Sequence, residues 1–536
     1  MKKYLKRYSD QNPEKFNKDF ILGREKDDIL ETVKDIFKTL EVIDEFKVEE
    51  VSISQDESTF GPIKMQHRYY KSVLPSRLDK IHYRVRVTPS EDTELGPIEF
   101  GAERKDDEAA KPSENSFIQE GDIYLNKLVD NCFYINEGVR YFLVYQIVDN
   151  ATYGTEDCVS LKSLLMPITL KQHEVIATPE FNGDPVTLKG FDVLLFAKKV
   201  NPVLYFMGKE AYNDLIETPI PEDSNSFTVW TTKKDSALID RFNEFFGVDF
   251  AFSADINDPA FKDRTVFKLL TEKGKDVKGC YVGVPTDKLK AKDKNVMSVL
   301  GSLLDIRDET KKKRIVFSYD DLITPWFWIN SLAGFFCKNT DYLKRMSKIR
   351  TTLISLNRIT DSTTRKILKL KDEDKHDTLT IIRYIMRDFD RLQSEDSQDL
   401  DNKRLRLHEY QIYPLRAYFS AQLYRIFNSQ TRSKLVLSRA LSNLSPTFVI
   451  KSTITNELLR YYGASNEIDL YTSLLKFSFR GPQSITSSSV SVRQRDLTPT
   501  QTGRISLVAS SASDPGLSGN LTPFVEVWDG FFKKQD

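Results

Sequence analysis

Basic side chains recur in a segment near the carboxyl end that is rich in rigid turns. The basic residues are Lys476, Arg480, Arg493, Arg495 and Arg504. Gly481-Pro482, Thr498-Pro499-Thr500 and Gly503 supply the turns. A guanidinium held on a stiff loop loses little conformational entropy when it pairs, so this pattern suits contacts to phosphate backbones. Ion pairs with nearby carboxylates such as Asp496 explain the same pattern equally well, and the residue types leave both interpretations open.

Two aspartates, Asp388 and Asp390, flank Phe389. Two carboxylates can share a divalent ion where a tight turn converges them, as in a magnesium-binding loop. However, Phe389 completes an apolar stripe at helical spacing that begins at Leu379, and neighbouring side chains on a helix point about 100° apart. A third carboxylate is also missing from the motif. A buried Phe389 on an amphipathic helix is therefore the favoured interpretation.

The local patterns of common metal and nucleotide sites are missing from the sequence. The histidines are His67, His82, His173, His376 and His408, and none of them has HxxxH or HExxH spacing. No GxGxxG, Walker or GxSxG pattern occurs, so a glycine-rich phosphate cradle and serine-hydrolase chemistry lack their usual geometry. The run Lys311-Lys312-Lys313-Arg314 either contacts phosphate or forms a solvated edge before a predicted strand at Ile315–Phe317, which is its more usual role. A stand-alone enzyme is not favoured.

Length and charge limit the classes of protein that fit. The 536 residues predict about three or four domains. Lys and Arg total 78 and Asp and Glu total 78, so the net charge is zero and a general nucleic-acid coat is excluded. Any phosphate binding must be local. With 40% hydrophobic and 11% aromatic residues, the chain has enough apolar surface to fold.

Cysteine usage and hydropathy predict a reduced, intracellular protein. The four cysteines stand far apart and form no CxxC pair. The polar stretch from Tyr8 to Phe20 lacks the apolar core of a signal peptide. The most apolar segment, Trp326–Cys337, is well short of the ~20 residues of a membrane span, so no membrane partner is expected.

Hydrophobic periodicity outlines the elements at the two ends of the chain. A helical pattern extends to about Phe46, and Ile81–Val87 alternates as a strand. A hairpin runs from Phe133 through a turn at Gly138, expected in the left-handed region, and returns as one strand to Val148. Further helices are predicted at 415–427 and 454–462, before a serine-rich loop at 484–491 and a loop-rich tail.

The middle, 151–375, reads as an inserted α+β domain without a repeat period. Examples of its elements are a strand at Asp192–Phe196 and a helix at Ala237–Phe246. Charge-dense breaks are predicted at Lys369–His376 and Ser394–Asp401, with an amphipathic helix between them.

Phe479-Arg480-Gly481-Pro482 and Arg495–Ile505 resemble the fork region of the beta subunit of multisubunit DNA-directed RNA polymerases, and their spacing fits without a gap. Five earlier blocks agree with this family in order. They are Gly121–Leu125, Phe133–Ile147, Asp377–Ile385, Asp401–Arg406 and Tyr461–Ser465. The resemblance directly covers about a third of the chain, and 151–375 offers no clear match.

The resemblance implies a multidomain α+β architecture. Residues 1–150 would form the first part of a protrusion, and 151–375 an inserted lobe. Residues 376–470 would be a helical return that ends the lobe and completes the protrusion. Residues 471–536 would form the fork region facing the active centre.

The resemblance also implies function and partners. The chain looks like the amino-terminal half of a split beta subunit, similar to those of giant tailed phages, since a cellular beta subunit continues for several hundred residues. No catalysis is expected from this chain alone, because Mg²⁺ would be bound by a beta-prime-like partner. The other partners would be the carboxyl-terminal beta fragment, a possible promoter-specificity subunit, template DNA and the transcript. The location would be the host cytoplasm during infection, or the virion.

The residue roles carried over are all contacts to nucleic acid. They involve Lys476, Ser478, Arg480, Arg493, Arg495, Arg504 and Asn520. Lys476 and Ser478 match positions that in cellular enzymes line the rifampicin pocket, but the segment from Ser465 to Lys476 differs and is shorter, so rifampicin resistance is expected. Ser487 and Ser489 stand where arginines are usual, and residues 509–516 replace the family's acidic-proline stretch.

Two alternatives come from other classes of protein. One is a virion or nucleic-acid-binding structural protein that keeps the fold without transcribing. The other is a separate hydrolase or nuclease. A fixed-ratio complex with other polymerase chains, a solitary soluble monomer, or metal-dependent cleavage by the isolated chain distinguishes the three.

Overall fold

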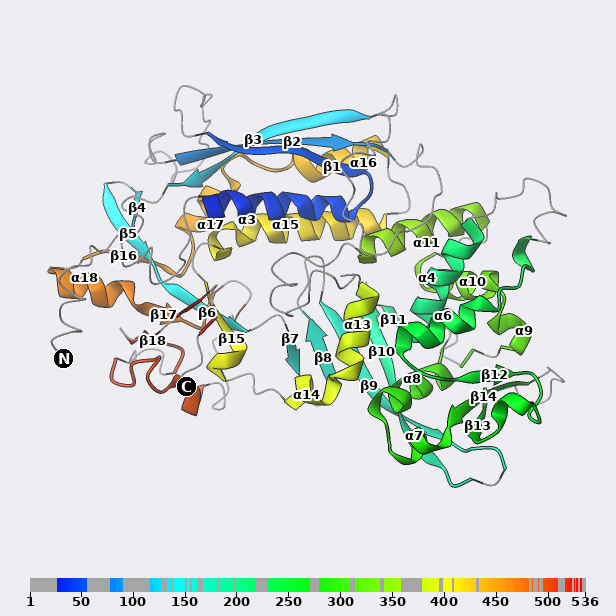
Figure 1. Ribbon diagram of the computed structural model, residues 1–536. Coiled ribbons are helices and arrows are strands. Elements are labelled where there is room, and N and C mark those ends of the chain that lie inside the picture. Colours follow the sequence, from blue (N-terminus) through cyan, green and yellow to red (C-terminus); the bar gives the residue numbers. More distant parts are fainter. Residues whose placement is uncertain are drawn as a thin grey trace.

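The computed structural model shows a multidomain α+β protein, as predicted (Figure 1). The structure describes residues 27–54, 78–89, 116–127, 133–136, 138–149, 152–154, 157–161, 167–181, 183–195, 198–216, 230–269, 279–307, 314–315, 317–337, 342–357, 378–394, 399–406, 409–429, 433–463, 465–481, 484, 490, 495–509, 516–522, 525, 527–528 and 531–532. The first 26 residues of the predicted amino-terminal helix, the break at 369–376 and most of the loop at 484–491 lie outside these residues.

The first unit is a helix packed on an antiparallel three-stranded sheet. β1 (Phe46–Ser54), β2 (Leu78–Val87) and β3 (Phe117–Asn126) lie in that order. In β2 the predicted alternation holds, since Ile81 and Val85 are fully buried and Arg84 is exposed. Helix α3 (Asp27–Lys38) buries Phe37, whose ring lies 5.0 Å from that of Tyr83.

Helices from late in the sequence complete this first unit (Figure 1). They are α15 (Glu409–Asn428), α16 (Lys434–Ser442) and α17 (Phe448–Ile454). The predicted helix at 415–427 lies inside α15. The ring of Phe419 packs edge-on against Phe37 with centroids 5.1 Å apart, and the amide of Tyr124 donates to the Pro446 carbonyl over 2.9 Å.

The chain between these parts folds as a second α+β unit, on the right in Figure 1, whose core is continuous with that of the first. Its main sheet is antiparallel, in the order β11 (Lys198–Val200), β10 (Val186–Leu195), β9 (Ile168–Ala177), β8 (Cys158–Leu161) and β7 (Thr152–Gly154). A smaller sheet has the order β12 (Ala251–Ser253), β14 (Cys280–Pro285) and β13 (Arg264–Leu269). The predicted strand at Asp192–Phe196 overlaps β10.

Helices surround these two sheets. They are α4 (Pro202–Ile216), α6 (Ala237–Phe246), α7 (Thr286–Lys290), α8 (Lys294–Leu304), α9 (Tyr319–Leu322), α10 (Pro325–Phe336), α11 (Tyr342–Asn357), α13 (Thr378–Arg387) and α14 (Phe389–Ser394). The helix predicted at Ala237–Phe246 is confirmed with the same bounds. No helix in the described part of the chain is both long and apolar enough to cross a membrane.

Two sequence predictions for the region between the units are wrong. The hairpin forms, with β4 (Phe133–Asn136) and β5 (Val139–Leu143) joined at Gly138, whose φ is 76° as expected. The returning strand does not continue to Val148, because the Val144 amide donates to Leu458 and a new strand, β6 (Tyr145–Asp149), pairs elsewhere. The helix predicted at 454–462 does not form, because α17 ends at Ile454, where the predicted helix was to begin.

The segment after Ile454 becomes a strand because a partner edge is available. The Leu458 amide donates to the Asn456 side chain over 2.9 Å, which turns the chain. β16 (Leu459–Tyr461) then pairs with β5. The hydrophobic pattern of this segment favours a helix, but pairing with a strand more than 300 residues earlier outweighs that local preference.

A six-stranded sheet gathers segments from across the chain. Its order is β18 (Ser518–Asn520), β17 (Lys476–Ser478), β6, β15 (Lys403–Arg406), β20 (Phe531–Phe532) and β19 (Val527–Trp528). β17 runs parallel to β6, and the other paired strands are antiparallel. A separate apolar cluster that includes Tyr145, Phe477 and Leu517 stabilises it.

Candidate nucleic-acid interface

The first predicted contact residues lie on the paired strands β17 and β18, of which β18 is at the edge of the sheet. Lys476 is exposed, and its Nζ lies 5.9 Å from the centre of the Phe142 ring. Its partner across the strands is Asn520, whose Nδ2 donates to the Thr472 carbonyl over 3.1 Å. Thr472 belongs to helix α18 (Glu467–Leu474). Asn520 therefore ties the helix to the sheet and lies directly beside the strand position of Lys476.

Ser478 and Arg480 belong to a buried hydrogen-bond chain. The Arg480 amide donates to Ser478 Oγ over 3.0 Å, and the Arg480 carbonyl accepts from Gln146 Nε2 over 3.1 Å. Gln146 is fully buried and accepts from Arg406 Nε over 2.8 Å. Leaving a buried amide or guanidinium without a hydrogen-bond partner costs folding free energy. These hydrogen bonds therefore fix the turn after β17 relative to β6 and β15.

Arg504 is buried, and its guanidinium is bound within the chain. Its Nη1 donates to Asp401 Oδ1 over 2.7 Å and to the Thr500 carbonyl over 3.3 Å. The side chain is only 5% exposed. Thr500 Oγ1 in turn accepts from the Leu400 amide over 3.1 Å. Of the two interpretations that the sequence left open, these contacts favour a brace for Arg504.

The remaining predicted residues are placed less tightly. Arg495 is partly buried, next to the exposed Asp496. Arg493, together with Ser487 and Ser489, lies outside the described residues. The structure thus brings Lys476, Ser478 and Asn520 together on one sheet and places Arg480 directly after it.

Sequence reasoning missed three side chains in this layer. Gln146 and Arg406 carry the buried hydrogen-bond chain. Lys403 is 6% exposed, and its Nζ lies 5.3 Å from the centre of the Phe479 ring, a cation–π arrangement. All three fall inside blocks of the polymerase resemblance. For Gln146 the sequence signal was an amide within the otherwise largely apolar strand β6, where a buried amide requires a partner. β15 is Lys-Arg-Leu-Arg, so nothing in its sequence indicated that Lys403 and Arg406 are buried.

The aspartate pair has a structural role in this chain. Phe389 is 2% exposed and packs edge-on against Phe191, as predicted. The helix is not continuous, however, because α13 ends at Arg387 and α14 begins at Phe389. Asp390 accepts from Lys189 over 2.8 Å and pairs with Lys294 over 2.9 Å. The hydrogen bonds from these two lysines lower the pKa of Asp390.

A second carboxylate in the central unit gathers three basic groups. Asp305 is 1% exposed, and the side chains of His173, Arg307 and Arg314 lie 2.7–2.9 Å from its oxygens. Burial acts to raise the pKa of Asp305, but hydrogen bonds from these three groups outweigh it and lower the pKa to about 2. Arg314 of the basic run is therefore an internal brace, and 311–313 lie outside the described residues.

The strand predicted at Ile315–Phe317 is not among the described strands; just before it, Arg314 forms an isolated antiparallel bridge with Arg307. The Ile315 amide donates to the Ile306 carbonyl over 2.7 Å, which continues this short contact. Residue 316 lies outside the described residues. Among the residues that the structure describes, no group of three His, Cys, Asp or Glu side chains converges on a common point.

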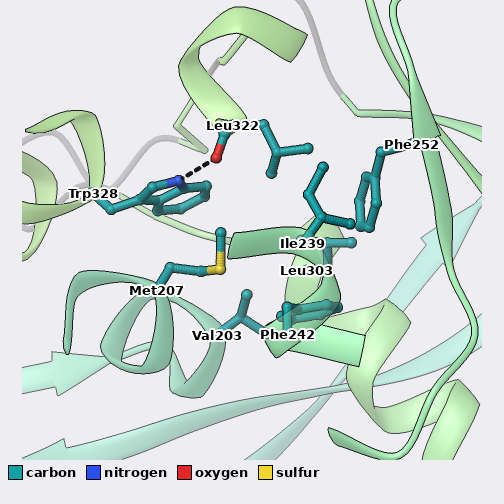
Figure 2. Close-up of a pocket in the computed structure, with 8 residues that line it drawn as sticks. All are labelled: Val203, Met207, Ile239, Phe242, Phe252, Leu303, Leu322 and Trp328. Carbon is teal, nitrogen blue, oxygen red and sulfur yellow. Dashed lines mark hydrogen bonds between the residues drawn. The ribbon is translucent and has the colours of Figure 1, made fainter. Parts of the chain in front are cut away.

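A small cavity in the central unit is apolar (Figure 2). It is lined by Val203, Met207, Ile239, Phe242, Phe252, Leu303, Leu322 and Trp328. Trp328 Nε1 donates to the Leu322 carbonyl over 2.8 Å, so the indole is satisfied within the fold. None of these lining side chains is titratable or nucleophilic, so the cavity is a packing feature of the core.

One comparison with known proteins covers nearly the whole chain. A family model described as "Non-virion RNA polymerase subunit" matches residues 2–531. The match includes the central unit, where the sequence itself shows no clear resemblance block. A search of curated proteins finds no match to the chain.

Proposed function

The chain belongs to the family of non-virion RNA polymerase subunits, and from this premise we propose that it is the amino-terminal part of a split beta subunit. In this role it forms the protrusion, lobe and fork wall of the cleft of a multisubunit DNA-dependent RNA polymerase. The enzyme transcribes the genes of a giant tailed phage in the cytoplasm of the infected cell. Membership of a polymerase subunit family implies that other subunits share the complex.

The observation that carries this proposal is the composition of the six-stranded sheet. Its strands β6, β15 and β17 come from, or directly precede, the segments whose sequences resemble the beta subunit. The Arg406–Gln146–Arg480 chain links three of these segments in a buried site. Segments that resemble one functional region and also converge in space support a common role at that region.

The proposed division of labour assigns catalysis to other chains. RNA polymerisation proceeds by attack of the RNA 3′-hydroxyl on a nucleotide α-phosphate, and Mg²⁺ bound by a beta-prime-like partner supplies charge stabilisation. In this chain, Lys476 and Arg480 contact phosphates of the RNA–DNA hybrid, and Arg493 and Arg495 contact the downstream fork. Ser478 and Arg504 hold the loops, and Asn520 fixes the strand beside Lys476.

The test of the proposed function is the composition of the native complex. The chain is purified from infected cells, and the co-eluting polypeptides are identified by mass spectrometry. We expect a carboxyl-terminal beta fragment and beta-prime-like chains in fixed ratio, with or without a promoter-specificity subunit. Recovery of the chain as a solitary monomer, or with structural virion proteins alone, would reject the proposal.

A second experiment tests the assigned contacts. Lys476→Ala with Arg480→Ala removes two phosphate contacts, so elongation complexes of the variant should dissociate faster than those of the wild type. The difference in lifetime should be measurable as salt is raised. Lys262→Ala with Lys290→Ala is the control, because both lysines are exposed on the central unit. An unchanged lifetime of the complex at raised salt would contradict the assignment.

A further inference from the structure

The sheet formed by β16, β5 and β4 carries two arginines on one face, Arg140 and Arg460. The polymerase resemblance assigns no role to either of them. Arg460 lies directly opposite Phe142, which lies opposite Phe133, so these three side chains share a face. Arg140 is two residues before Phe142 and shares that face as well. Both arginines are exposed, whereas Phe142 and Phe133 are 3% and 5% exposed.

Cation–π contacts orient these side chains over the buried rings. The Arg140 guanidinium carbon lies 5.6 Å from the centre of the Phe133 ring. Lys476 reaches the same face from β17, with Nζ 5.9 Å from the Phe142 ring. Tyr462, two residues after Arg460, packs on Phe133 with centroids 4.8 Å apart. Arg140 and Lys476 are therefore held over aromatic rings and are partly pre-organised.

The charges of this face are not neutralised within the described part of the protein. Neither Arg140, Arg460 nor Lys476 forms an ion pair with any described carboxylate. Arg241, Arg307 and Arg504, in contrast, all have such partners. Arg140 and Arg460 on adjacent strands, with Lys476 from the neighbouring six-stranded sheet, are three cations without a carboxylate partner among the described residues, and they form a local positive surface in a chain whose net charge is zero.

We propose that Arg140, Arg460 and Lys476 together hold one nucleic-acid strand by its phosphates. Arg140 and Arg460 are diagonal neighbours on one sheet, where Cβ atoms lie about 7–8 Å apart, and long basic side chains at that spacing can contact successive phosphates. Lys476 adds a third cation from β17, through its position over the Phe142 ring. The buried rings orient Arg140 and Lys476, and the three cations contact phosphates and not bases, so binding is independent of base sequence. This inference rests on the proposed function and extends its contact surface from the fork to β5 and β16.

The experiment measures binding of a fluorescent 20-nucleotide single strand to the purified full chain over a series of salt concentrations. Arg140→Gln with Arg460→Gln should weaken binding and reduce the slope of log affinity against log salt by about 1.4, because each neutralised phosphate on a single strand contributes about 0.7. The matched control is Arg425→Gln with Arg439→Gln, two exposed arginines on α15 and α16, which should leave the slope unchanged.

Each outcome decides the proposal. An unchanged slope in the Arg140/Arg460 variant, an equal loss in the control, or no binding by the wild-type chain overturns it. Salt-dependent binding of polyglutamate that the Arg140/Arg460 variant loses, without salt-dependent binding of the nucleic-acid strand, would assign the face to an acidic protein segment and also overturns it. Circular dichroism of the variants confirms that they fold.

The result is separable from the proposed function. If the chain co-purifies with polymerase subunits but the double variant keeps the wild-type slope, only this inference fails. If the slope falls as expected but the chain never enters a polymerase complex, the proposed function fails and the phosphate-binding face stands.

Discussion

Arg406 donates through Nε to Oε1 of Gln146 over 2.8 Å, in a site that joins β15 to β6 across 260 residues of chain. Gln146 is fully buried and Arg406 is 4% exposed. The same Gln146 side chain donates to the Arg480 carbonyl, so one amide holds both the strand register and the turn after β17.

Arg406→Met should destabilise the six-stranded sheet by about 2–3 kcal/mol, because it leaves a buried amide oxygen without its charged donor. Hydrogen exchange of the β6 and β15 amides measures the effect locally, since a protein with several units need not unfold in one transition. The exposed Arg425→Met is the control. Equal protection in both variants would show that the link contributes nothing.

Arg504→Gln should loosen the loop around Pro499–Gln501 and leave nucleic-acid affinity unchanged, because the guanidinium is committed to Asp401. In a double-mutant cycle with Asp401→Asn, we expect a coupling energy of about 1–3 kcal/mol. Exchange of the Ile505 and Thr522 amides, which bond to Gln501 and Arg504, is the measurement. A reduced salt slope for nucleic-acid binding with unchanged exchange would instead identify Arg504 as a phosphate contact.

Gly481→Ala should destabilise the turn after β17 by about 1–3 kcal/mol. The residue has a φ of 118°, and an added Cβ would lie 2.8 Å from Gln146 Nε2 and 2.9 Å from a Leu458 methyl carbon. Loss of protection at the β17 amides is the measurement. Gly334→Ala is the opposite case, since a Cβ there meets no atom within 4 Å and helix α10 should gain about 0.5–1 kcal/mol. Destabilisation by both substitutions would refute this explanation.

The central unit should lose stability as pH rises from about 4 to about 7. Burial raises the pKa of Asp214 to about 7, and Asp214 shares Arg241 with Asp235. Burial acts to raise the pKa of Asp235 too, but hydrogen bonds from Asp214 and Arg241 outweigh it and lower that pKa. The folded state therefore keeps a proton on Asp214 that the unfolded chain releases near pH 4, so stability falls until the folded group also ionises.

Asp214→Asn should remove this fall, because the amide still donates to Asp235 without titrating. Unfolding by urea is followed at each pH by the fluorescence of Trp230, Trp326 and Trp328, which all lie in this unit. Asp240→Asn on the exposed face of α6 is the control and should behave like the wild type. Equal pH profiles for both variants would contradict the prediction.

The assembled polymerase should resist rifampicin. This expectation depends on the differences in sequence between Ser465 and Lys476 and on Lys476 at the edge of β17. Transcription by the purified complex is measured with increasing drug, beside a bacterial housekeeping polymerase as the sensitive control. Inhibition at low-micromolar drug would contradict the prediction.

Much of the local structure follows from short-range patterns. The turn at Gly138, the alternation of β2, the helix α6 and the burial of Phe389 were all predictable, because each depends on neighbours within a few residues. The same holds for the α+β class. The resemblance blocks, read in order, also indicated a polymerase subunit, in agreement with the family match.

The tertiary structure alone decided which side chains meet. The helical period at 454–462 lost to pairing with β5, and the strand 139–148 divided at Val144, because hydrogen-bond partners came from segments hundreds of residues away. For the same reason Arg504 could be read from sequence as a basic loop residue but not as the partner of Asp401. Residue type and spacing determine the local preference for helix, strand or turn. Whether a charge is buried, and which residue it pairs with, depends on contacts that form only when the whole chain folds.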